Sequence, residues 1–532
     1  MIHDELWYKD AVFYQVYIRG FKDSNGDGFG DLRGLEEKLE YIHELGIDCI
    51  WLMPIYPSPL RDDGYDIADY YNVAEMYGDL EDLKSLVKSA HALDIRVIMD
   101  LVLNHTSDEH PWFKASRSDR NSPYRDYYVW SDTDRKYQDA RIIFLDTEVS
   151  NWAWDERTAQ YYWHRFYSSQ PDLNFDHPAV QEEMFNVARF WLELGIDGFR
   201  ADAVPYLFER EGTNCENLPE THTYLKKLRA VMDSEYPGRI LLCEANQWPE
   251  DVRPYFGDGD EFHMGFHFPI MPRIYMALKK ERPDDMIEIL RRTPPIPENC
   301  QWCIFLRNHD ELTLEMVTPE ERDWMWQQYA PEPRMKLNLG IRRRLASLLD
   351  HDRRRIELAN SLLFTLPGSP IIYYGDEIGM GDNLDLFDRN GVRTPMQWDD
   401  SPNAGFTTGT PFSEFVKGDL GYERVNVAKQ VADPQSLFHA ISRMVNIRKR
   451  HHTFGRGSME WVETDNPSLA VYTRKYLDET LLIVNNLSST TQWTSLPLEF
   501  HGEYLDLIPN TERHIDAPLS LQPYTHLWLK RK

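Results

Sequence analysis

Eight short runs of β-branched and aromatic residues alternate with helical patterns through roughly the first 375 residues, and this alternation constrains the fold most. Such an order is typical of parallel βα units. Between the runs, apolar residues recur at spacings of three and four, as one-faced helices require. The expected strands are 13–18, 49–52, 96–101, 198–201, 240–243, 261–264, 302–305 and 371–374. We therefore predict an α/β fold, a closed (β/α)8 TIM barrel whose catalytic groups lie at the carboxyl ends of the strands.

Two interruptions and one change of pattern divide the chain. Residues 105–177 lack long helical periodicity and are rich in Asp, Ser, Trp and Tyr, which indicates a lobe inserted after the third strand. A helical insertion is predicted at about 312–355. From 446 to 532, apolar and polar residues alternate, so we expect a C-terminal antiparallel β-sandwich domain there. The catalytic barrel then comprises 1–104 and 178–445.

The net charge limits the classes of partner. Against 58 Lys and Arg stand 87 Asp and Glu, a formal charge of −29 that repels phosphate backbones and anionic membranes. Nucleic acid and membrane partners are therefore not expected. No basic region followed by an apolar run opens the chain, and its five cysteines do not form a disulfide framework. We therefore predict a cytoplasmic location.

Three acidic residues fall where predicted strands end, namely Asp202, Glu244 and Asp310. Cleaving a glycosidic bond through a covalent intermediate needs an ionised carboxylate and a protonated acid about 5 Å apart. Arg200, on the same strand face as Asp202, would keep that carboxylate ionised, and an apolar setting would raise the pKa of Glu244. Any one of these acids could equally be a helix cap or an ion-pair partner, and their joint setting favours catalysis. His105 and His309 are further donors at strand ends.

Four segments, 100–105, 198–203, 244–248 and 305–310, resemble the hallmark regions of the α-amylase superfamily of glycoside hydrolases and transglycosidases. The resemblance implies that Asp202 is the nucleophile and Glu244 the general acid and base. Asp310 would bind hydroxyl groups of the distorted sugar ring. Arg200, His105 and His309 would line the same glucose subsite.

Further segments narrow the resemblance. Residues 62–66 and 393–398 are similar to the pocket of enzymes that bind a terminal glucose, which adds Asp62, Tyr65 and Arg393 to the substrate-binding residues. Oligo-1,6-glucosidases, α-glucosidases and sucrose isomerases share these features. Three segments look like those of the subgroup that isomerises maltose to trehalose: 162–175, 244–248 and 307–315. The first of them contains Gln170, which we add to the substrate-binding residues.

The expected activity is therefore that of an isomerase, an intramolecular transglycosidase that retains the anomeric configuration and releases a little glucose. A hydrolytic glucosidase or a sucrose-isomerase-like enzyme is the alternative. A noncatalytic relative of the same fold is a weaker one, because the chain keeps all three carboxylates. Maltose and trehalose are the expected small-molecule partners. Members of this subgroup can associate with a maltokinase, and the sequence leaves a maltokinase partner and a homo-oligomer open.

Two cation sites are expected, and no organic cofactor. Asp23, Asn25, Asp27 and Asp31 place oxygen side chains at alternate positions of a glycine-rich loop, as at the start of a calcium loop. The twelfth position is Gly34, so the loop is not an EF-hand, and an Asx-rich turn without metal is the alternative. The resemblance implies calcium or magnesium here, with the carbonyl of Phe29 as a ligand. It implies a second cation, calcium, held by Asn104, Asp172, Glu209 and the main-chain oxygens of Tyr206 and Leu207.

Overall fold

Eight parallel strands close into a barrel in the order β1-β14-β10-β9-β8-β7-β3-β2 in the computed structural model, which describes residues 4–516 and 518–532. The first three residues of the predicted range 1–104 lie outside the described residues. The barrel strands are β1 (Phe13–Val16), β2 (Cys49–Leu52), β3 (Arg96–Val102), β7 (Gly198–Asp202), β8 (Ile240–Cys243), β9 (Met264–Phe266), β10 (Gln301–Phe305) and β14 (Ser369–Tyr373). The predicted fold class is confirmed.

The sixth strand begins later than predicted. Pairing between β8 and β9 starts at Leu242 and Met264, so the expected strand 261–264 was placed too early. The reason lies in His263, whose ring nitrogen accepts the N–H of Leu241 at 3.1 Å. A side chain thus takes the donor that a longer backbone ladder would have used.

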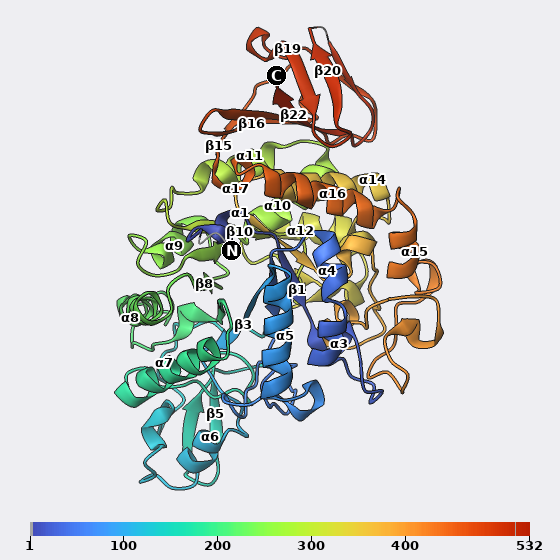
Figure 1. Ribbon diagram of the computed structural model, residues 1–532. Helices are drawn as coiled ribbons and strands as arrows, with labels where there is room; N and C mark the ends of the chain where they lie inside the picture. The colour runs from blue at the N-terminus through green and yellow to red at the C-terminus, as the bar shows by residue number, and fades with distance from the viewer. Residues whose placement is uncertain (1–3, 517) are drawn as a thin grey trace.

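Helices surround the barrel in Figure 1. The longer ones are α5 (Leu80–Ala92), α7 (Pro178–Glu193), α8 (Pro219–Glu235), α10 (Ile270–Lys280), α11 (Asp284–Arg292), α14 (Arg353–Thr365) and α16 (Leu437–Arg450), and the shorter ones include α3 (Leu32–Glu37) and α4 (Leu39–Leu45). Local chemistry sets their ends. At the start of α5, Asp79 accepts from the backbone of Asp82, whose side chain accepts in return from Asp79.

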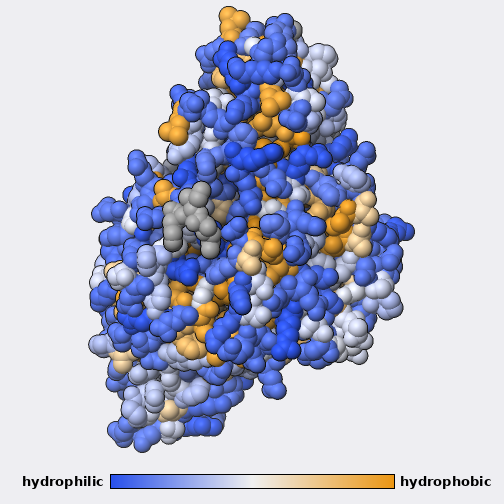
Figure 2. Space-filling view, viewed as in Figure 1, coloured by the Kyte–Doolittle hydropathy of each residue, from blue (hydrophilic) through white to orange (hydrophobic). Residues whose placement is uncertain are grey.

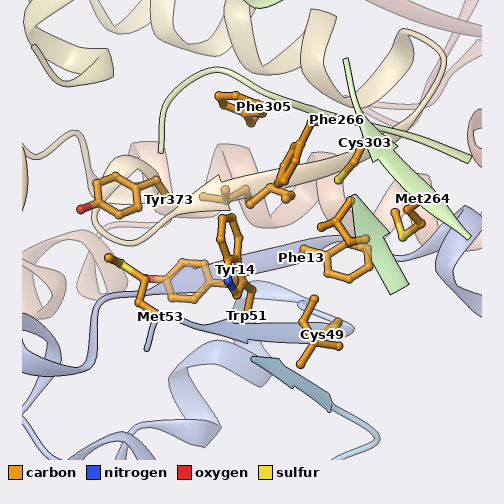
Figure 3. Packing of buried hydrophobic residues seen from close by; sticks show 14 of the residues in the cluster. Phe13, Tyr14, Cys49, Trp51, Met53, Met264, Phe266, Cys303, Phe305 and Tyr373 are labelled. Atoms are coloured by element: carbon orange, nitrogen blue, oxygen red, sulfur yellow. The ribbon is translucent and has the colours of Figure 1, made fainter. Parts of the chain in front are cut away.

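The barrel interior is a packed core and not a channel. Figure 3 shows aromatic and sulfur-containing side chains of several strands in contact. Trp51 of β2 and Phe266 of β9 come from opposite sides of the barrel, and their ring centroids are 5.8 Å apart. Phe305 of β10 packs edge-on against Phe266 at 5.5 Å. These rings form a floor beneath the carboxyl ends of the strands, where the loops build the site.

The lobe between β3 and β7 contains α6 (Pro111–Ser116) and a three-stranded antiparallel sheet, β4 (Trp130–Ser131), β6 (Gln160–Trp163) and β5 (Trp152–Asp155). Phe113 of α6 packs on Trp130 and Tyr162 of this sheet. An isolated bridge between His105 and Asp172 holds the base of the lobe to the barrel. The lobe is therefore anchored beside the end of β3.

The segment predicted as a helical insertion is only partly helical. It contains α12 (Pro319–Tyr329) and α13 (Leu345–Leu348), but also a small antiparallel sheet, β11 (Leu312–Thr313), β13 (Gly340–Ile341) and β12 (Lys336–Leu337). These strands have only two residues each, too few to show an alternating pattern in the sequence. The sheet follows β10 directly, so it lies at the carboxyl end of the barrel.

The C-terminal region forms a six-stranded antiparallel sheet and a two-stranded one, seen at the top of Figure 1. The first consists of β15 (Ser458–Trp461), β16 (Leu469–Tyr476), β17 (Glu479–Asn486), β22 (His526–Arg531), β19 (Gly502–Asp506) and β20 (Thr511–Ile515), and the second of β18 (Gln492–Thr494) and β21 (Leu519–Leu521). Trp528 of β22 donates to Ser361 of α14 at 2.9 Å. This contact joins the sheet to the barrel's helical layer.

The visible face of the molecule is mostly hydrophilic, with scattered apolar residues (Figure 2). None of the helices in the described part of the chain has the length and apolar character needed to cross a membrane.

Candidate active site

Three barrel strands deliver their acidic residues to one cavity. Asp202 is the last residue of β7, Glu244 follows β8 directly, and Asp310 lies in the loop after β10. All three line the same cavity. Its other lining residues come from the loops and the lobe: Asp62, Tyr65, His105, Ile143, Phe144, Phe166, Ala203, Pro205, Tyr206, Asn246, Phe268, Asn308, His309, Glu311, Thr313, Glu315 and Arg389. The predicted convergence of the three carboxylates is therefore observed.

A single buried guanidinium holds two of the carboxylates together. Nη1 of Arg200, in β7, is 2.6 Å from Oδ1 of Asp202, and Nη2 donates to Oε1 of Glu244. The same Nη1 is 2.5 Å from Oδ1 of the buried Asp100 in β3. Asp202 and Glu244 share this guanidinium and are hydrogen-bonded to each other, which gives them the short separation of retaining glycosidases. The wider spacing of inverting enzymes, about 6.5–9.5 Å, leaves room for a water between the carboxylates.

The electrostatics of this pair separate an acid from a base. Burial raises the pKa of Asp202 to about 6, although the charge of Arg200 opposes the shift. Burial raises the pKa of Glu244 further, to about 8, because the negative charges of Asp202 and Asp310 add to it. At neutral pH Asp202 is therefore ionised and Glu244 protonated, which are the states that a nucleophile and a general acid need.

Asp310 lies between two arginines of the loop after β14. Its Oδ1 is 3.0 Å from Nη1 of Arg389 and 3.0 Å from Nη2 of Arg393. Burial alone would raise the pKa of Asp310, but its positively charged surroundings lower it overall. Burial holds the pKa of His309 well below its ordinary value, so we count that ring as neutral and assign the effect to the two guanidinium groups. Asp310 is thus a fixed anion.

Arg389 also joins Asp310 to the opposite wall. Its Nη2 is 3.0 Å from Oδ1 of Asp62, in the loop after β2. Burial raises the pKa of Asp62 to about 7, even though Arg389 opposes the shift. The amide of Gln170, from the lobe, donates to the other oxygen of Asp62 at 2.9 Å. Barrel and lobe therefore meet at Asp62.

Tyr65 and two histidines complete the inner wall. The Tyr65 ring stacks on His309 with centroids 5.4 Å apart and planes 16° apart. His105 packs against Phe166 of the lobe at 5.1 Å. Burial lowers the pKa of His105 to about 3, so this ring is neutral at physiological pH. An aromatic surface beside fixed polar groups is suited to a sugar, whose ring faces are apolar and whose rim carries hydroxyls.

The substrate-binding residues predicted from the sequence fall into two groups, those that line the cavity and those that lie behind its wall. Asp62, Tyr65, His105 and His309 line the cavity. Three others lie behind that wall and position it: Gln170, Arg200 and Arg393.

Sequence reasoning missed Arg389, which lies in an irregular loop without periodicity. It also missed Asp100 as the partner of Arg200, although Asp100 opens one of the segments that carried the resemblance.

The mouth of the cavity is bridged by ion pairs. Arg141, in the lobe, is 2.8 Å from Glu315 of the segment after β10. It also lies 2.9 Å from Glu216, and it donates to the hydroxyl of Tyr206 at 3.2 Å. Glu315 and Tyr206 line the cavity. The arrangement ties the lobe to the opposite rim.

A second bridge spans the same mouth. The backbone N–H of Asn338 donates to Oδ2 of Asp146 in the lobe at 2.9 Å. Its side-chain amide donates to the cavity residue Glu311 at 3.1 Å. Phe144, which lies between Arg141 and Asp146 in the chain and lines the cavity, packs on Tyr167 with ring centroids 4.5 Å apart. Lobe and rim together narrow the access of water to the carboxylates.

The first predicted cation loop is shaped by its own hydrogen bonds. Oδ1 of Asp23 accepts from the backbone of Asn25 and Gly26, and Asn25 and Asp27 accept from residues two further on. Both oxygens of Asp31 accept from Ser24. Within residues 4–516 and 518–532, no group of three or more His, Cys, Asp or Glu side chains could hold a metal. These hydrogen bonds hold the loop in shape without a metal ion. Calcium or magnesium at this loop therefore stays a prediction.

The second predicted cation site has unsatisfied donor atoms. Oδ1 of Asn104, Oδ2 of Asp172 and Oε1 of Glu209 are buried without a hydrogen-bond partner in the described structure. Burial raises the pKa of Asp172 to about 8. Burial, with the charge of Asp172, raises that of Glu209 well above its usual value. Three buried oxygens without donors, two of them carboxylate oxygens, fit a hard cation.

Two family models match the chain. The model described as "Alpha amylase, catalytic domain" matches residues 15–331 and 338–457. The model described as "Maltogenic Amylase, C-terminal domain" matches residues 459–528.

Similar curated proteins carry names from one group of enzymes. A "Trehalose synthase/amylase TreS" of Mycobacterium tuberculosis is 58% identical over 97% of this chain and 87% of its own length. A "Trehalose synthase" of Thermus thermophilus is 53% identical over 95% of this chain and 52% of its own length. An "Oligo-1,6-glucosidase" of Parageobacillus thermoglucosidasius is 32% identical over 93% of this chain and 92% of its own length.

Similar solved structures share the whole architecture. The trehalulose synthase MutB from Pseudomonas mesoacidophila MX-45 matches with a TM-score of 0.80 and 30% identity. That match covers 99% of each chain. An α-glucosyl transfer enzyme, XgtA, matches with a TM-score of 0.81 and 29% identity, again over 99% of each chain.

Proposed function

Because the chain belongs to the α-amylase family of enzymes, we propose that it is a trehalose synthase, an isomerase that converts maltose to trehalose by retaining double displacement. One observation carries the proposal: Asp202 and Glu244 share Arg200 at the bottom of a cavity whose mouth is bridged by Arg141. Relatives 53–58% identical over nearly the whole chain, which are named trehalose synthases, support it.

In the first half of the reaction, a carboxylate oxygen of Asp202 attacks the anomeric carbon of the non-reducing glucose of maltose. Glu244 gives its proton to the glycosidic oxygen as the bond between that oxygen and the anomeric carbon breaks. The products are a glucosyl ester of Asp202 and one free glucose. Asp310, kept anionic by Arg389 and Arg393, accepts hydrogen bonds from hydroxyls of the captured ring.

In the second half, the free glucose turns within the cavity until its own anomeric hydroxyl faces the ester. Glu244, now ionised, takes the proton of that hydroxyl. At the same time the hydroxyl oxygen attacks the anomeric carbon of the glucosyl unit, and the ester bond to Asp202 breaks. Two inversions at this carbon retain its configuration. Water competes for the ester, so the bridged mouth decides how much glucose is released.

The test follows both products and the fate of the leaving glucose. Maltose is incubated with the enzyme and isotope-labelled glucose, and the sugars are separated by anion-exchange chromatography. We expect trehalose as the dominant product, free of label, because the attacking glucose never leaves the cavity. Asp202→Asn, which keeps size and shape, should lower turnover roughly 10⁴-fold or more. Dominant glucose would instead identify a hydrolytic glucosidase, and label in trehalose would contradict the retained intermediate.

The alternative activities have a direct assay. Relatives named oligo-1,6-glucosidase are 31–34% identical. The structures named trehalulose synthase are 30–32% identical. Incubation with isomaltose and with sucrose separates these two activities from the isomerisation of maltose.

The cation between lobe and barrel is part of the proposal. When bound, it would neutralise Asp172 and Glu209 and fix the lobe, through Asp172, to Asn104 and Glu209 of the barrel, with the main-chain oxygens of Tyr206 and Leu207 as further ligands. Metal analysis of the purified enzyme should find calcium, and chelation should lower the melting temperature. A protein without metal and with a melting temperature that chelators do not change would contradict this part. The cytoplasmic location and the maltokinase partner stay predictions.

A further inference from the structure

A buried glutamine on the first barrel strand is directed at the active site. Gln15 in β1 is fully buried, and its amide Nε2 is 2.7 Å from Nδ1 of His309. Gln15 does not line the cavity, so it can act on the substrate only through His309. We propose that Gln15 is a positioning residue that holds His309 in the neutral form with its proton on Nε2, pointing at Asp310 and the sugar.

The protonation of His309 follows from its surroundings. Burial keeps the pKa of this ring well below its ordinary value, so it carries a single proton. Its Nε2 is 3.2 Å from Oδ2 of Asp310 and 2.8 Å from the hydroxyl of Tyr65. A lone pair on Nε2 would repel the Asp310 carboxylate, whereas an N–H is attracted to it. The proton therefore belongs on Nε2.

That assignment makes Nδ1 an acceptor, and an acceptor in a dry interior needs a donor. The amide NH₂ of Gln15 supplies it. In the described structure this is the only hydrogen bond of the Gln15 side chain, and its Oε1 is buried without a partner. A buried amide with an unsatisfied oxygen destabilises a barrel core relative to an apolar residue. The hydrogen bond to His309 is therefore the reason for a glutamine at position 15.

The inference rests on the proposed function only in taking a glucosyl unit as the occupant of the pocket. Capture of that unit by Asp202 precedes both isomerisation and hydrolysis. Total maltose consumption therefore measures the effect of Gln15 even if glucose proves to be the main product. Product ratios test the proposed function separately.

Two variants remove or reverse the donor, and a third serves as control. Gln15→Leu removes it and should lower kcat for maltose consumption about tenfold, the loss expected for one hydrogen bond, with KM nearly unchanged. Gln301→Leu is the matched control. Gln301 is also a buried glutamine of the barrel, but it is the first residue of β10, at the end of the barrel away from the site, and its side chain bonds only to main-chain atoms. It should keep the wild-type kcat and pH profile.

Gln15→Glu should add a new alkaline limb to the pH profile. While the introduced carboxyl group and His309 together hold one extra proton, Nε2–H is preserved, whichever atom carries that proton. When the extra proton leaves, the carboxylate draws the remaining one to Nδ1, and turnover falls as pH rises. The charged groups that act on the His309 ring are Asp310, Arg200, Arg389 and Arg393, and all of them are present in both proteins. A purely structural role of Gln15 would not shift this limb.

The inference fails if Gln15→Glu has the wild-type pH profile, or if Gln15→Leu keeps full kcat. Should these variants not fold, nitrogen NMR of histidine-labelled wild-type enzyme decides the question. The His309 signals are assigned by their loss in His309→Gln. Protonated Nε2 and bare Nδ1 are expected, and a proton on Nδ1 would overturn the proposal.

Discussion

Replacing Arg141 by Met should convert part of the isomerase activity into hydrolysis. Arg141 carries no chemistry and does not line the cavity, but it joins the lobe to the rim through Glu315 and Glu216. Met keeps much of the length and apolar contact of the side chain and removes its charge. The substitution therefore tests the closure of the mouth with the catalytic carboxylates left intact.

The magnitude follows from the exposure of these ion pairs. The Arg141 side chain is 39% exposed, and those of Glu315 and Glu216 are 20% and 8% exposed. The pair with Glu315 is screened by solvent and contributes about 0.5 kcal/mol, and the better buried pair with Glu216 contributes about 1 kcal/mol. Losing about 1.5 kcal/mol of closure raises the population of the open mouth roughly tenfold. We expect the ratio of glucose to trehalose to rise about five- to tenfold.

The assay is a time course of trehalose and glucose from maltose, with the initial rates compared as a ratio. Arg189→Met is the matched control, because Arg189 forms an ion pair with Glu235 on the helical layer, away from the cavity. It should leave the ratio unchanged. An Arg141→Met enzyme with the wild-type ratio and a normal melting temperature would refute the idea that these pairs exclude water.

Three further predictions concern the carboxylates. The profile of kcat/KM against pH should rise through about pH 6, as Asp202 loses its proton. It should fall above about pH 8, as Glu244 loses the proton that the leaving glucose needs. A profile that is flat from pH 5 to 9 would contradict both assignments. Glu244→Gln should lose about 10²–10⁴-fold of its turnover with maltose. It should still release fluoride from α-glucosyl fluoride, which needs no acid, and equal losses on both substrates would contradict the role. Arg389→Lys should lower kcat/KM for maltose about 100-fold or more, because a lysine cannot replace the buried guanidinium group that binds Asp62 and Asp310 together. A change below threefold would show that Arg389 is dispensable.

Local patterns in the sequence were enough to place the barrel and its catalytic acids. Strand and helix periodicities are local, and the carboxyl ends of parallel barrel strands meet at one face. Residues that follow such strands, Asp202 and Glu244 among them, could therefore be placed in a common site without coordinates. The short strands after β10 could not, since two residues carry no readable period.

Arg200 apart, the side chains that tune those acids and bridge the site's mouth became visible only in the folded molecule. Arg389 lies 327 residues from Asp62 in the chain, and Gln15 lies 294 residues from His309. Arg141 and Glu315 are separated by 174 residues. No local pattern links such pairs, because the contacts arise only when irregular loops pack over the barrel end. Protonation states and water access depend on those contacts, so the sequence located the chemistry and the packing set its conditions.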